Sequence, residues 1–335
     1  MPVIMISGAS AGVGRATVRR FAGPGMRIGL IARSSERLEA AAAEVRERGG
    51  EALVLPLDVA DAAAVEDAAE RLEAAFGPID AWINVAMVTV LSPVAQMTPE
   101  EYRRVTDVTY LGTVHGTLAA LKRMKPRDRG TIVQVGSALG YRSIPLQSAY
   151  CAAKAAVRSF TDSLRSELMH DGSGVRLTMV QLPAVNTPQF DWARNKMPHR
   201  PQPLPPIFQP EPIADAIHHA AHEARREYWL GFSAVKAIMG QKLAPGLGDR
   251  ILASEAYSGQ ATDEPAEERP DNLFDPVPGD YGAHGRFDGQ AASRSPAIWV
   301  SEHRDLAVGL GALALAALVA GAMGAAGRAS RGGRR

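Results

Sequence analysis

The chain has 335 residues, and its 37 Lys and Arg residues nearly balance its 36 Asp and Glu residues. At roughly 100–200 residues per domain, this length allows one large domain with an addition or two ordinary domains. The balanced charge argues against a global basic surface for nucleic acid and against a disordered acidic chain. The single cysteine, Cys151, excludes an intramolecular disulfide and any site built from several cysteines, and it indicates an intracellular main body.

Short apolar runs alternate with amphipathic segments along the first 231 residues. Each run is too short for a helix and predicts a buried strand; the runs cover residues 2–7, 26–32, 52–57, 81–85, 131–135, 175–181 and 227–231. Apolar residues three and four apart predict helices between them, over residues 13–21, 35–48, 62–76, 99–122, 148–170 and 212–224. Strands without a polar face that alternate with helices predict an α/β fold, a doubly wound parallel sheet with helices on both faces.

The composition changes beyond this alternating region. Residues 259–304 combine acidic clusters with Pro, Gly and Ser and few aliphatic side chains, which predicts an extended or weakly ordered segment. Within it, residues 271–288 place Phe274, Tyr281 and Phe287 among Gly and Pro. Two alternatives fit this pattern: a loop that docks on the domain surface, or disorder.

Residues 306–327 form an uncharged apolar run, followed by an arginine-rich tail at 328–335. At 1.5 Å per residue, a helix of this length would be about 33 Å long, enough to cross a bilayer core of about 30 Å. Its many Ala and Gly residues make insertion marginal, and a single span from the cytoplasm would place the terminal arginines outside. The run therefore predicts a transmembrane helix, a helix on the inner membrane surface, or a helix packed against a second subunit.

A glycine-rich turn directly follows the first predicted strand and opens the first predicted helix. It contains Gly8, Ser10, Gly12, Val13 and Gly14. Glycines there allow a sharp turn and close approach of a pyrophosphate, while the helix N-terminus offers N–H groups and the positive end of its dipole. A plain strand-to-helix connection is the alternative, but the position at the start of a βαβ pattern favours dinucleotide binding.

The Gly-xxx-Gly-x-Gly spacing resembles that of the short-chain dehydrogenase/reductase family, and further motifs follow in the order found in that family. They are Asp58 and Val59 after the third predicted strand, Asn84 after the fourth, and Ser137, Tyr150 and Lys154 beyond. The resemblance covers about residues 1–255 and implies a catalytic domain there. Residues 256–305 are then a polar connector or docking loop. By the same resemblance, Asp58 and Val59 line the adenine pocket, and Asn84 lies beside the adenosine ribose.

The end of the second predicted strand bears on the choice of cofactor. An acidic residue there would bind the adenosine ribose hydroxyls and repel a 2′-phosphate. The chain instead has Arg33, whose guanidinium suits a phosphate. The sequence therefore favours NADP(H) over NAD(H), the alternative for Arg33 being a solvated charge at a helix start.

Tyr150 and Lys154 are four residues apart on a predicted helix and so share one face. A nearby ammonium stabilises a phenolate and lowers the tyrosine pKa, which makes Tyr150 the candidate acid–base. Ser137, at the end of a strand, can hydrogen-bond the substrate oxygen. The resemblance implies that Lys154 also binds the nicotinamide ribose.

The family pattern is not complete in this chain. Thr109 stands where the family usually has an asparagine that holds a water of the proton relay, and Val85 and Met87 replace an asparagine and a glycine. We expect an active enzyme with an altered relay or substrate pocket, although loss of activity is the alternative.

Two further stretches are predicted to complete the cleft. By the resemblance, Val185 and Thr187 contact the nicotinamide carboxamide. Residues 188–210, with seven prolines and several aromatic side chains, predict a substrate lid or a stiff surface loop. The histidines at 218, 219 and 222 lack a recognisable ligand set, so we expect solvated helix residues and no metal.

The sequence as a whole predicts an NADP(H)-dependent oxidoreductase that interconverts a carbonyl and an alcohol, with Tyr150 as acid–base. A non-catalytic cofactor-binding or membrane-attached protein of the same fold is the alternative. The expected partners are a small carbonyl or alcohol substrate, lipophilic if the chain contacts a membrane, and a second copy in a homodimer or homotetramer, without nucleic acid. We expect the catalytic domain in the cytoplasm, attached to the inner face of a membrane through 306–327 or else soluble.

Overall fold

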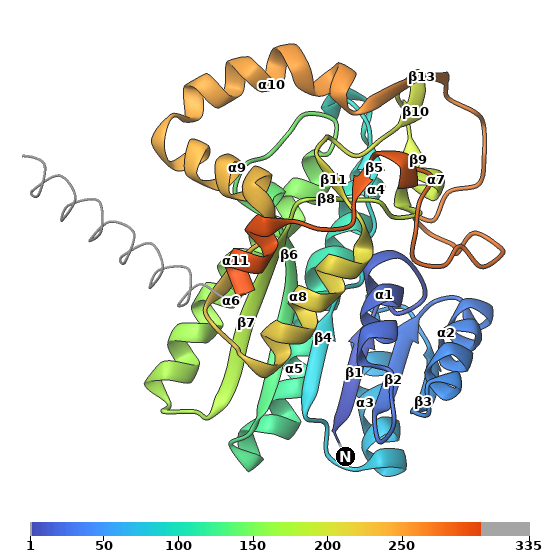
Figure 1. Ribbon diagram of the computed structural model, residues 1–335, viewed down its shortest axis with the longest axis vertical. Helices are drawn as coiled ribbons and strands as arrows, with labels where there is room; N and C mark the ends of the chain where they lie inside the picture. Colours follow the sequence, from blue (N-terminus) through green and yellow to red (C-terminus); the bar gives the residue numbers. More distant parts are fainter. Residues whose placement is uncertain (1, 303–335) are drawn as a thin grey trace, which may run out of the picture.

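A parallel seven-stranded sheet forms the centre of the computed structural model, which describes residues 2–302 (Figure 1). Its strands, in spatial order, are β12 (Glu227–Trp229), β7 (Val175–Leu182), β6 (Gly130–Ser137), β4 (Ala81–Asn84), β1 (Val3–Ser7), β2 (Arg27–Ala32) and β3 (Glu51–Pro56). All six neighbouring pairs are parallel. These are the seven strands expected from the apolar runs, so the doubly wound, Rossmann-like fold is confirmed.

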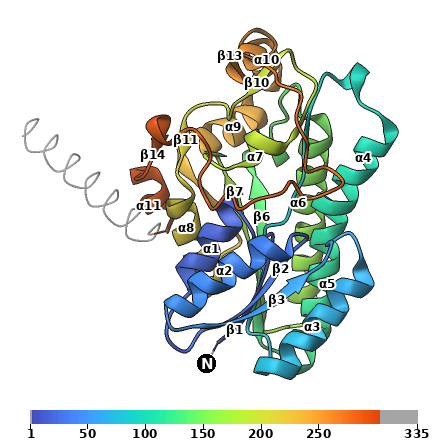
Figure 2. The same cartoon turned by 90° about the vertical axis from the view of Figure 1, so that its right-hand side faces the viewer.

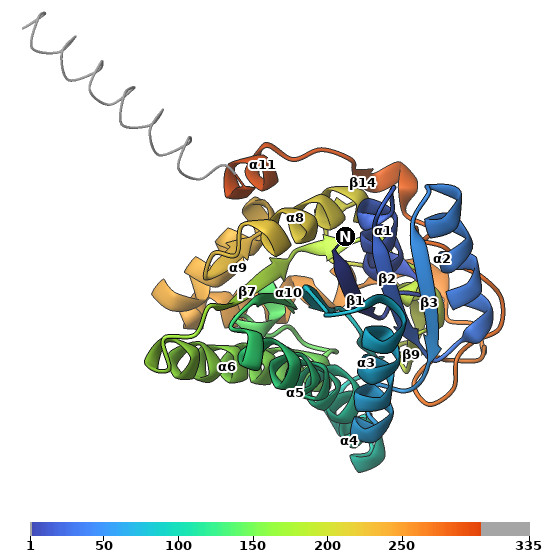
Figure 3. The same ribbon diagram turned by 90° about the horizontal axis from the view of Figure 1, so that it is seen from below.

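Helices cover both faces of this sheet (Figure 3). One face carries α1 (Gly12–Phe21), α2 (Ser35–Glu47) and α8 (Pro210–His222), and the other carries α3 (Ala62–Phe76), α5 (Gly112–Met124) and α6 (Ser148–His170). Strand β1 shows why its sequence has no polar face. Ile4 and Ile6 pack in the core on one side of the sheet, while Val3 and Met5 pack in the core on the other side.

The helix expected over residues 99–122 is interrupted in the structure. It consists of α4 (Pro99–Val105), a π-helical segment η2 (Thr106–Leu111) and α5. The start of α4 follows its sequence, because Thr98 and Glu101 form a capping box. Thr109 lies within the π-helical segment, and a wider turn of this kind is frequent near functional sites.

Two further helices, α9 (Gly231–Leu243) and α10 (Pro245–Gly259), lie beyond the carboxyl ends of the sheet strands (Figures 1 and 2). Short strands surround this end: β5 (Val90–Leu91) pairs with β9 (Arg194–Asn195), and β10 (His199–Pro201) pairs with β13 (Ala261–Pro265). A third small sheet has the order β14 (Ala291–Ala292), β11 (Ile207–Phe208), β8 (Ala184–Val185). Between α6 and α8 the chain also forms the short helix α7 (Gln189–Trp192).

Residues 271–292, which we call the strap, lie against the domain and lead to the last described helix, α11 (Pro296–Glu302). In Figure 1 this dark orange segment runs beyond the upper ends of α1 and α2 and returns to α11 beside α8. Leu273, Val277, Ala283 and Phe287 of the strap are buried. Of the two alternatives left open by the sequence, the structure has the docked loop.

No helix within residues 2–302 is long and apolar enough to cross a membrane. The apolar run at 306–327 and the basic tail at 328–335 lie outside the described residues. Among the described residues, no group of three or more His, Cys, Asp or Glu side chains could hold a metal ion. The expectation of solvated histidines was wrong for His218, which is half-buried with its ring tilted against that of Phe21 and whose pKa burial lowers to about 4.

Candidate functional site

A cleft of about 400 Å³ lies at the carboxyl ends of the sheet strands. Its walls include the expected cofactor residues Gly8, Ser10, Gly12, Val13, Gly14, Arg33, Asp58, Val59, Val185 and Thr187, and the expected catalytic residues Ser137, Tyr150 and Lys154. The glycine turn and the tyrosine are thus parts of one cavity. This is the edge where open α/β sheets bind ligands, between strands whose connections run in opposite directions.

The glycine turn between β1 and α1 has a backbone that requires glycine. Gly8 and Gly12 have φ values of +72° and +57°, a region that side chains with a Cβ rarely adopt. A Cβ on Gly14 would lie 1.9 Å from the carbonyl oxygen of Gly8. The three glycines therefore keep the turn tight within the cleft wall, and a turn of this kind at the start of α1 fits a dinucleotide pyrophosphate.

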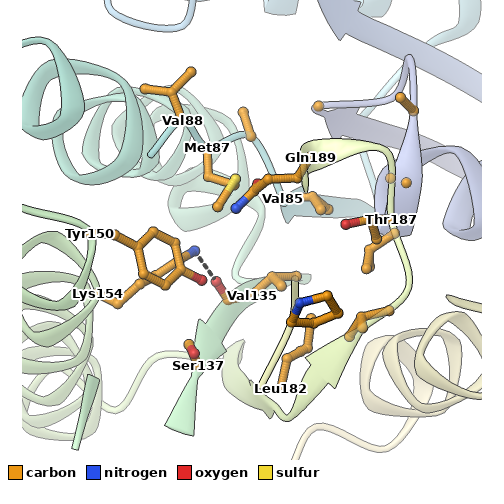
Figure 4. A pocket seen from close by; sticks show the side chains of 18 of the residues that line it. Val85, Met87, Val88, Val135, Ser137, Tyr150, Lys154, Leu182, Thr187 and Gln189 are labelled. Atoms are coloured by element: carbon orange, nitrogen blue, oxygen red, sulfur yellow. Dashed lines mark hydrogen bonds between the residues drawn. The ribbon is translucent and has the colours of Figure 1, made fainter. Parts of the chain in front are cut away.

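The expected catalytic side chains come from β6 and α6, and Figure 4 shows them on one side of the cavity. Ser137 ends β6, and its hydroxyl accepts a hydrogen bond from the Leu139 amide at 3.1 Å. Lys154 lies one helical turn beyond Tyr150; its Nζ donates to the Val135 carbonyl oxygen at 2.7 Å and lies 5.8 Å from the centre of the Tyr150 ring. The β6 backbone therefore fixes the lysine beside the tyrosine.

Burial controls the protonation of this pair. Burial raises the pKa of Tyr150, and a hydrogen bond with Ser137 acts in the opposite direction. Burial lowers the pKa of Lys154 to about 8. The net lowering of the tyrosine pKa that we expected is not found in this structure, because the loss of solvation outweighs the lowering by the Ser137 hydrogen bond.

Asn84 does not lie in the cleft wall, contrary to its expected place beside the adenosine ribose. Its side chain is buried inside the sheet, where its Oδ1 accepts from Trp82 Nε1 at 2.9 Å and its Nδ2 donates to Gln134 and Thr117. These three partners satisfy the amide within the core. The expected cofactor contact of Asn84 is therefore replaced by a role in holding β4 against β6 and α5.

Thr109 also lies behind the cleft wall. Its hydroxyl donates to the Val88 carbonyl oxygen at 3.0 Å and accepts from the Val88 amide at 3.1 Å. The side chain is fully buried. Thr109 thus fixes the segment after β4, whose residues Val85, Met87 and Val88 form an apolar part of the cleft wall (Figure 4).

The end of the cleft where the adenosine is expected, called the adenosine end below, contains Arg33 and Asp58, each with partners in the protein. Arg33 donates from its two terminal nitrogens to the carbonyl oxygens of Asn272 and Phe274, both at 2.5 Å. Asp58 forms an ion pair with Arg104 and accepts a hydrogen bond from the Ala60 amide at 3.0 Å. Arg33 is therefore neither a solvated charge nor a wholly free phosphate ligand.

The loop expected to act as a lid over residues 188–210 contributes directly to the cavity. Gln189, Phe190, Trp192, Pro203, Leu204 and Pro205 line it. Facing them are Leu139, Ile144, Ala237 and Leu252, the last two from α9 and α10. The substrate end of the cleft is thus mainly apolar.

Sequence reasoning missed the strap residues Asn272 and Pro276 as cleft residues, together with the helices α9 and α10. The three aromatic residues among Gly and Pro at 271–288 were the available signal. They indicated that this segment could dock on the domain, but not on which part of the domain surface. No local pattern pairs residue 33 with residues 272 and 274.

Comparisons with known proteins agree with this geometry. The family described as short chain dehydrogenase matches residues 2–198. An uncharacterized oxidoreductase, YxnA, of Bacillus subtilis (strain 168) is 32% identical over 296 residues, covering 88% of this chain and 82% of that protein. The chain therefore belongs to the short-chain dehydrogenase/reductase family, and the descriptions of both matches are those of oxidoreductases.

Other similar proteins have more specific descriptions. A fatty acyl-CoA reductase of Acinetobacter baylyi (strain ATCC 33305 / BD413 / ADP1) is 29% identical over 220 residues, covering 65% of this chain and 72% of that protein. Among solved structures, an alcohol dehydrogenase from the archaeon Thermococcus sibiricus, complexed with 5-hydroxy-NADP, has a TM-score of 0.58 and 27% identity. That match covers 68% of this chain and 94% of the other. The archaeal structure is consistent with a nicotinamide cofactor and with chemistry on an alcohol, and the Acinetobacter protein is consistent with a reductase.

Proposed function

We propose that this protein is an NADP(H)-dependent oxidoreductase that interconverts a carbonyl and an alcohol, with Tyr150 as the acid–base. The observation that carries this proposal is the single cavity that joins the glycine turn to Ser137, Tyr150 and Lys154. When bound, NADPH supplies the hydride to the carbonyl carbon. The chain's own residues then have to bind the carbonyl oxygen and deliver a proton to it.

Tyr150 and Ser137 are the groups for that oxygen. In the reductive direction, the Tyr150 hydroxyl gives its proton to the substrate oxygen as negative charge develops there, and the Ser137 hydroxyl donates a second hydrogen bond to it. The pKa of Tyr150, raised by burial, keeps the phenol protonated and suits this step. Lys154 stabilises the resulting phenolate through its charge and can reach the nicotinamide ribose.

Arg33 is the residue proposed to select NADP(H). It lies in the cleft wall at the end of β2, and the three residues that directly follow that strand are Arg33, Ser34 and Ser35, none of them acidic. A guanidinium has five N–H donors, and the strap carbonyl oxygens use only two of them. Donors therefore remain for a 2′-phosphate, with Ser34 beside them in the cleft wall.

The apolar substrate end favours a lipophilic carbonyl or alcohol. Met87, Ile144, Phe190, Leu204 and Leu252 line the cavity and carry no charge. Arg142, which also lines it, is engaged by Asp249 and Gln241. The fatty acyl-CoA reductase among the similar proteins is compatible with a substrate of this kind.

A homodimer or homotetramer is proposed through the outer faces of α5 and α6. Leu118 on α5 and Met169 on α6 expose 56% and 76% of their surface, and apolar side chains of this size commonly mark contact surfaces when they gather. Light scattering of the wild type and of a Leu118→Glu variant tests this. A monomeric wild type would contradict the proposal.

Turnover on a panel of aldehydes and ketones, followed by NADPH oxidation, tests the catalytic proposal. We expect Tyr150→Phe to lower kcat by roughly 10²–10⁴-fold and to retain NADPH binding in a fluorescence titration. Tyr257→Phe is the matched control, because Tyr257 is exposed on α10. Turnover that persists in Tyr150→Phe would contradict the assignment of the acid–base.

A wild type that binds NADPH but reduces no carbonyl would favour the non-catalytic alternative, suggested by Thr109 and Val85.

A further inference from the structure

The strap is fastened to the adenosine side of the cleft by two arginines. Arg33 donates to the carbonyl oxygens of Asn272 and Phe274, and Arg37 donates to those of Val277 and Gly279. The Arg37 guanidinium also lies 4.7 Å from the centre of the Trp192 ring and 4.9 Å from that of Tyr281. Stacking of this kind restrains both the arginine and the strap.

A second set of contacts fastens the other end of the strap beside the expected nicotinamide contacts. Asn186 accepts from the Phe287 amide at 3.0 Å and donates to Asp288 at 2.8 Å. His284 contacts Asp288 and Glu211 of α8, each at 2.8 Å. Asn186 directly precedes Thr187, so this end of the strap is tied to a segment of the cleft wall.

The strap also passes directly over the glycine turn. The Gly282 carbonyl oxygen accepts from the Gly12 amide at 3.0 Å. A Cβ on Gly285 would lie 2.4 Å from the carbonyl oxygen of Thr187, so the strap backbone lies too close to that segment for any other residue. The strap thus contacts the cofactor half of the cleft on two sides, at the glycine turn and at the segment that contains Thr187.

The strap bounds the cleft without filling it. Asn272 and Pro276 line the same cavity of about 400 Å³ that the glycine turn and Tyr150 line. The inward side chains Leu273, Val277 and Phe287 are buried in the domain rather than in that cavity. A dinucleotide could therefore lie beneath the strap, but it could not enter or leave past the Gly12–Gly282 contact unless the strap moved.

We propose that the strap is part of the cofactor site: it closes over the bound dinucleotide and must open for the cofactor to exchange. Arg33 couples closure of the strap to binding of the dinucleotide, since it donates to the strap and retains N–H groups for a 2′-phosphate. Tyr281 is a positioning residue that holds the strap through Arg37. This inference rests on the proposed cofactor, and its test does not require a substrate.

Trypsin cleavage after Arg286, identified by mass spectrometry of the fragments, reports opening of the strap. Arg286 is held closed by an ion pair with Asp191 and by a hydrogen bond to the Pro201 carbonyl oxygen at 2.7 Å. We expect saturating NADPH to slow this cleavage at least tenfold and NADH to slow it less. Cleavage that is unchanged or accelerated while NADPH is bound would overturn the inference.

Stopped-flow measurement of NADPH release provides the second readout. We expect Tyr281→Ala to speed release at least fivefold and to reduce the protection of Arg286. Tyr257→Ala is the control, since it removes an exposed tyrosine on α10, and it should change neither rate. Phe287→Ala loosens the end of the strap that contacts Asn186, and it should also speed NADPH release and reduce the protection of Arg286. If both strap variants fold, bind NADPH and release it at the wild-type rate, the strap does not retain the cofactor.

A fluorescence titration separates this inference from the proposed function. If neither NADPH nor NADH binds to the wild type, the cofactor assignment fails and the strap has nothing to close over. If NADPH binds and the strap experiments fail, only the present inference is overturned.

Discussion

The two ends of the cleft are built in different ways. At the catalytic end, Ser137, Tyr150 and Lys154 come from one strand and the helix that follows, and Lys154 is held by the backbone of that strand. At the adenosine end, Arg33 and Arg37 are held by carbonyl oxygens 239 to 242 positions away in the sequence. The first end is fixed by local structure, whereas the second depends on a segment that can detach.

This difference indicates where rigidity and exchange are required. Proton transfer needs a hydroxyl held close to the substrate oxygen, which favours a site anchored in the sheet core. A cofactor that leaves after each turnover needs an opening, which favours a closing element with separable hydrogen bonds. Substitutions at each end should therefore affect different measured quantities.

The largest expected effect is at the catalytic end. Ser137→Ala removes a hydrogen-bond donor to the developing alkoxide, and we expect kcat to fall by roughly 10²–10³-fold. NADPH affinity should change little, as measured by fluorescence titration. Ser137→Thr retains the hydroxyl and should recover part of the activity. A loss in NADPH affinity without a loss in kcat would show that Ser137 serves the cofactor instead.

The next effect is the change with pH in the protein's free energy of unfolding that results from the buried Lys154. Burial lowers the pKa of Lys154 from its ordinary value of 10.5 to about 8. Between these values the unfolded chain binds more protons than the folded one, so the free energy of unfolding should rise with pH. The full rise from this group is on the order of 3 kcal/mol.

Denaturant unfolding of the wild type and of Lys154→Met between pH 7 and pH 10 measures this rise. The difference between the two proteins isolates the lysine, because the other titrating groups are common to both. The wild type should gain stability relative to Lys154→Met as the pH increases above about 8. A difference that stays constant would show that the lysine is solvated in the folded protein.

Much of the catalytic end could be predicted from the sequence, because its residues follow strand ends and helix periodicity. Ser137, Tyr150 and Lys154 lie on the predicted strand and helix and line one cavity. Asn84 and Thr109 could not be placed in this way, since only the three-dimensional packing shows that their polar groups are satisfied by Gln134 and by the Val88 backbone. The strap was also unpredictable in detail, because its backbone carbonyl oxygens carry no sequence signature.

A smaller effect should be found at the adenosine end. Arg33→Ala removes charged hydrogen bonds to a 2′-phosphate, and we expect NADPH to bind roughly 10–100-fold more weakly. NADH has no such phosphate and should lose only the part of its affinity that depends on the strap. Arg33→Lys retains the charge but not the planar fork and should be intermediate. Isothermal titration with both cofactors measures the two losses, and equal losses would show that Arg33 is only a strap anchor.

The smallest expected effect concerns Thr109, which lies between the two ends. Its hydroxyl both donates to and accepts from the Val88 backbone. Thr109→Val has nearly the same shape but leaves two buried backbone groups without a partner, so we expect a loss of roughly 1–3 kcal/mol in the free energy of unfolding. Thr109→Ser retains the hydroxyl and should unfold close to the wild type.

The same variants show whether Thr109 takes part in proton transfer. If its role is to position the wall formed by Val85, Met87 and Val88, kcat in Thr109→Val should fall only a few-fold, and the pH profile of kcat should keep its shape. Thr109→Ser should restore both kcat and stability together. A fall of 10²-fold or more in kcat at unchanged stability would contradict the positioning role, because a residue that only supports the wall cannot affect proton transfer without affecting the fold around it.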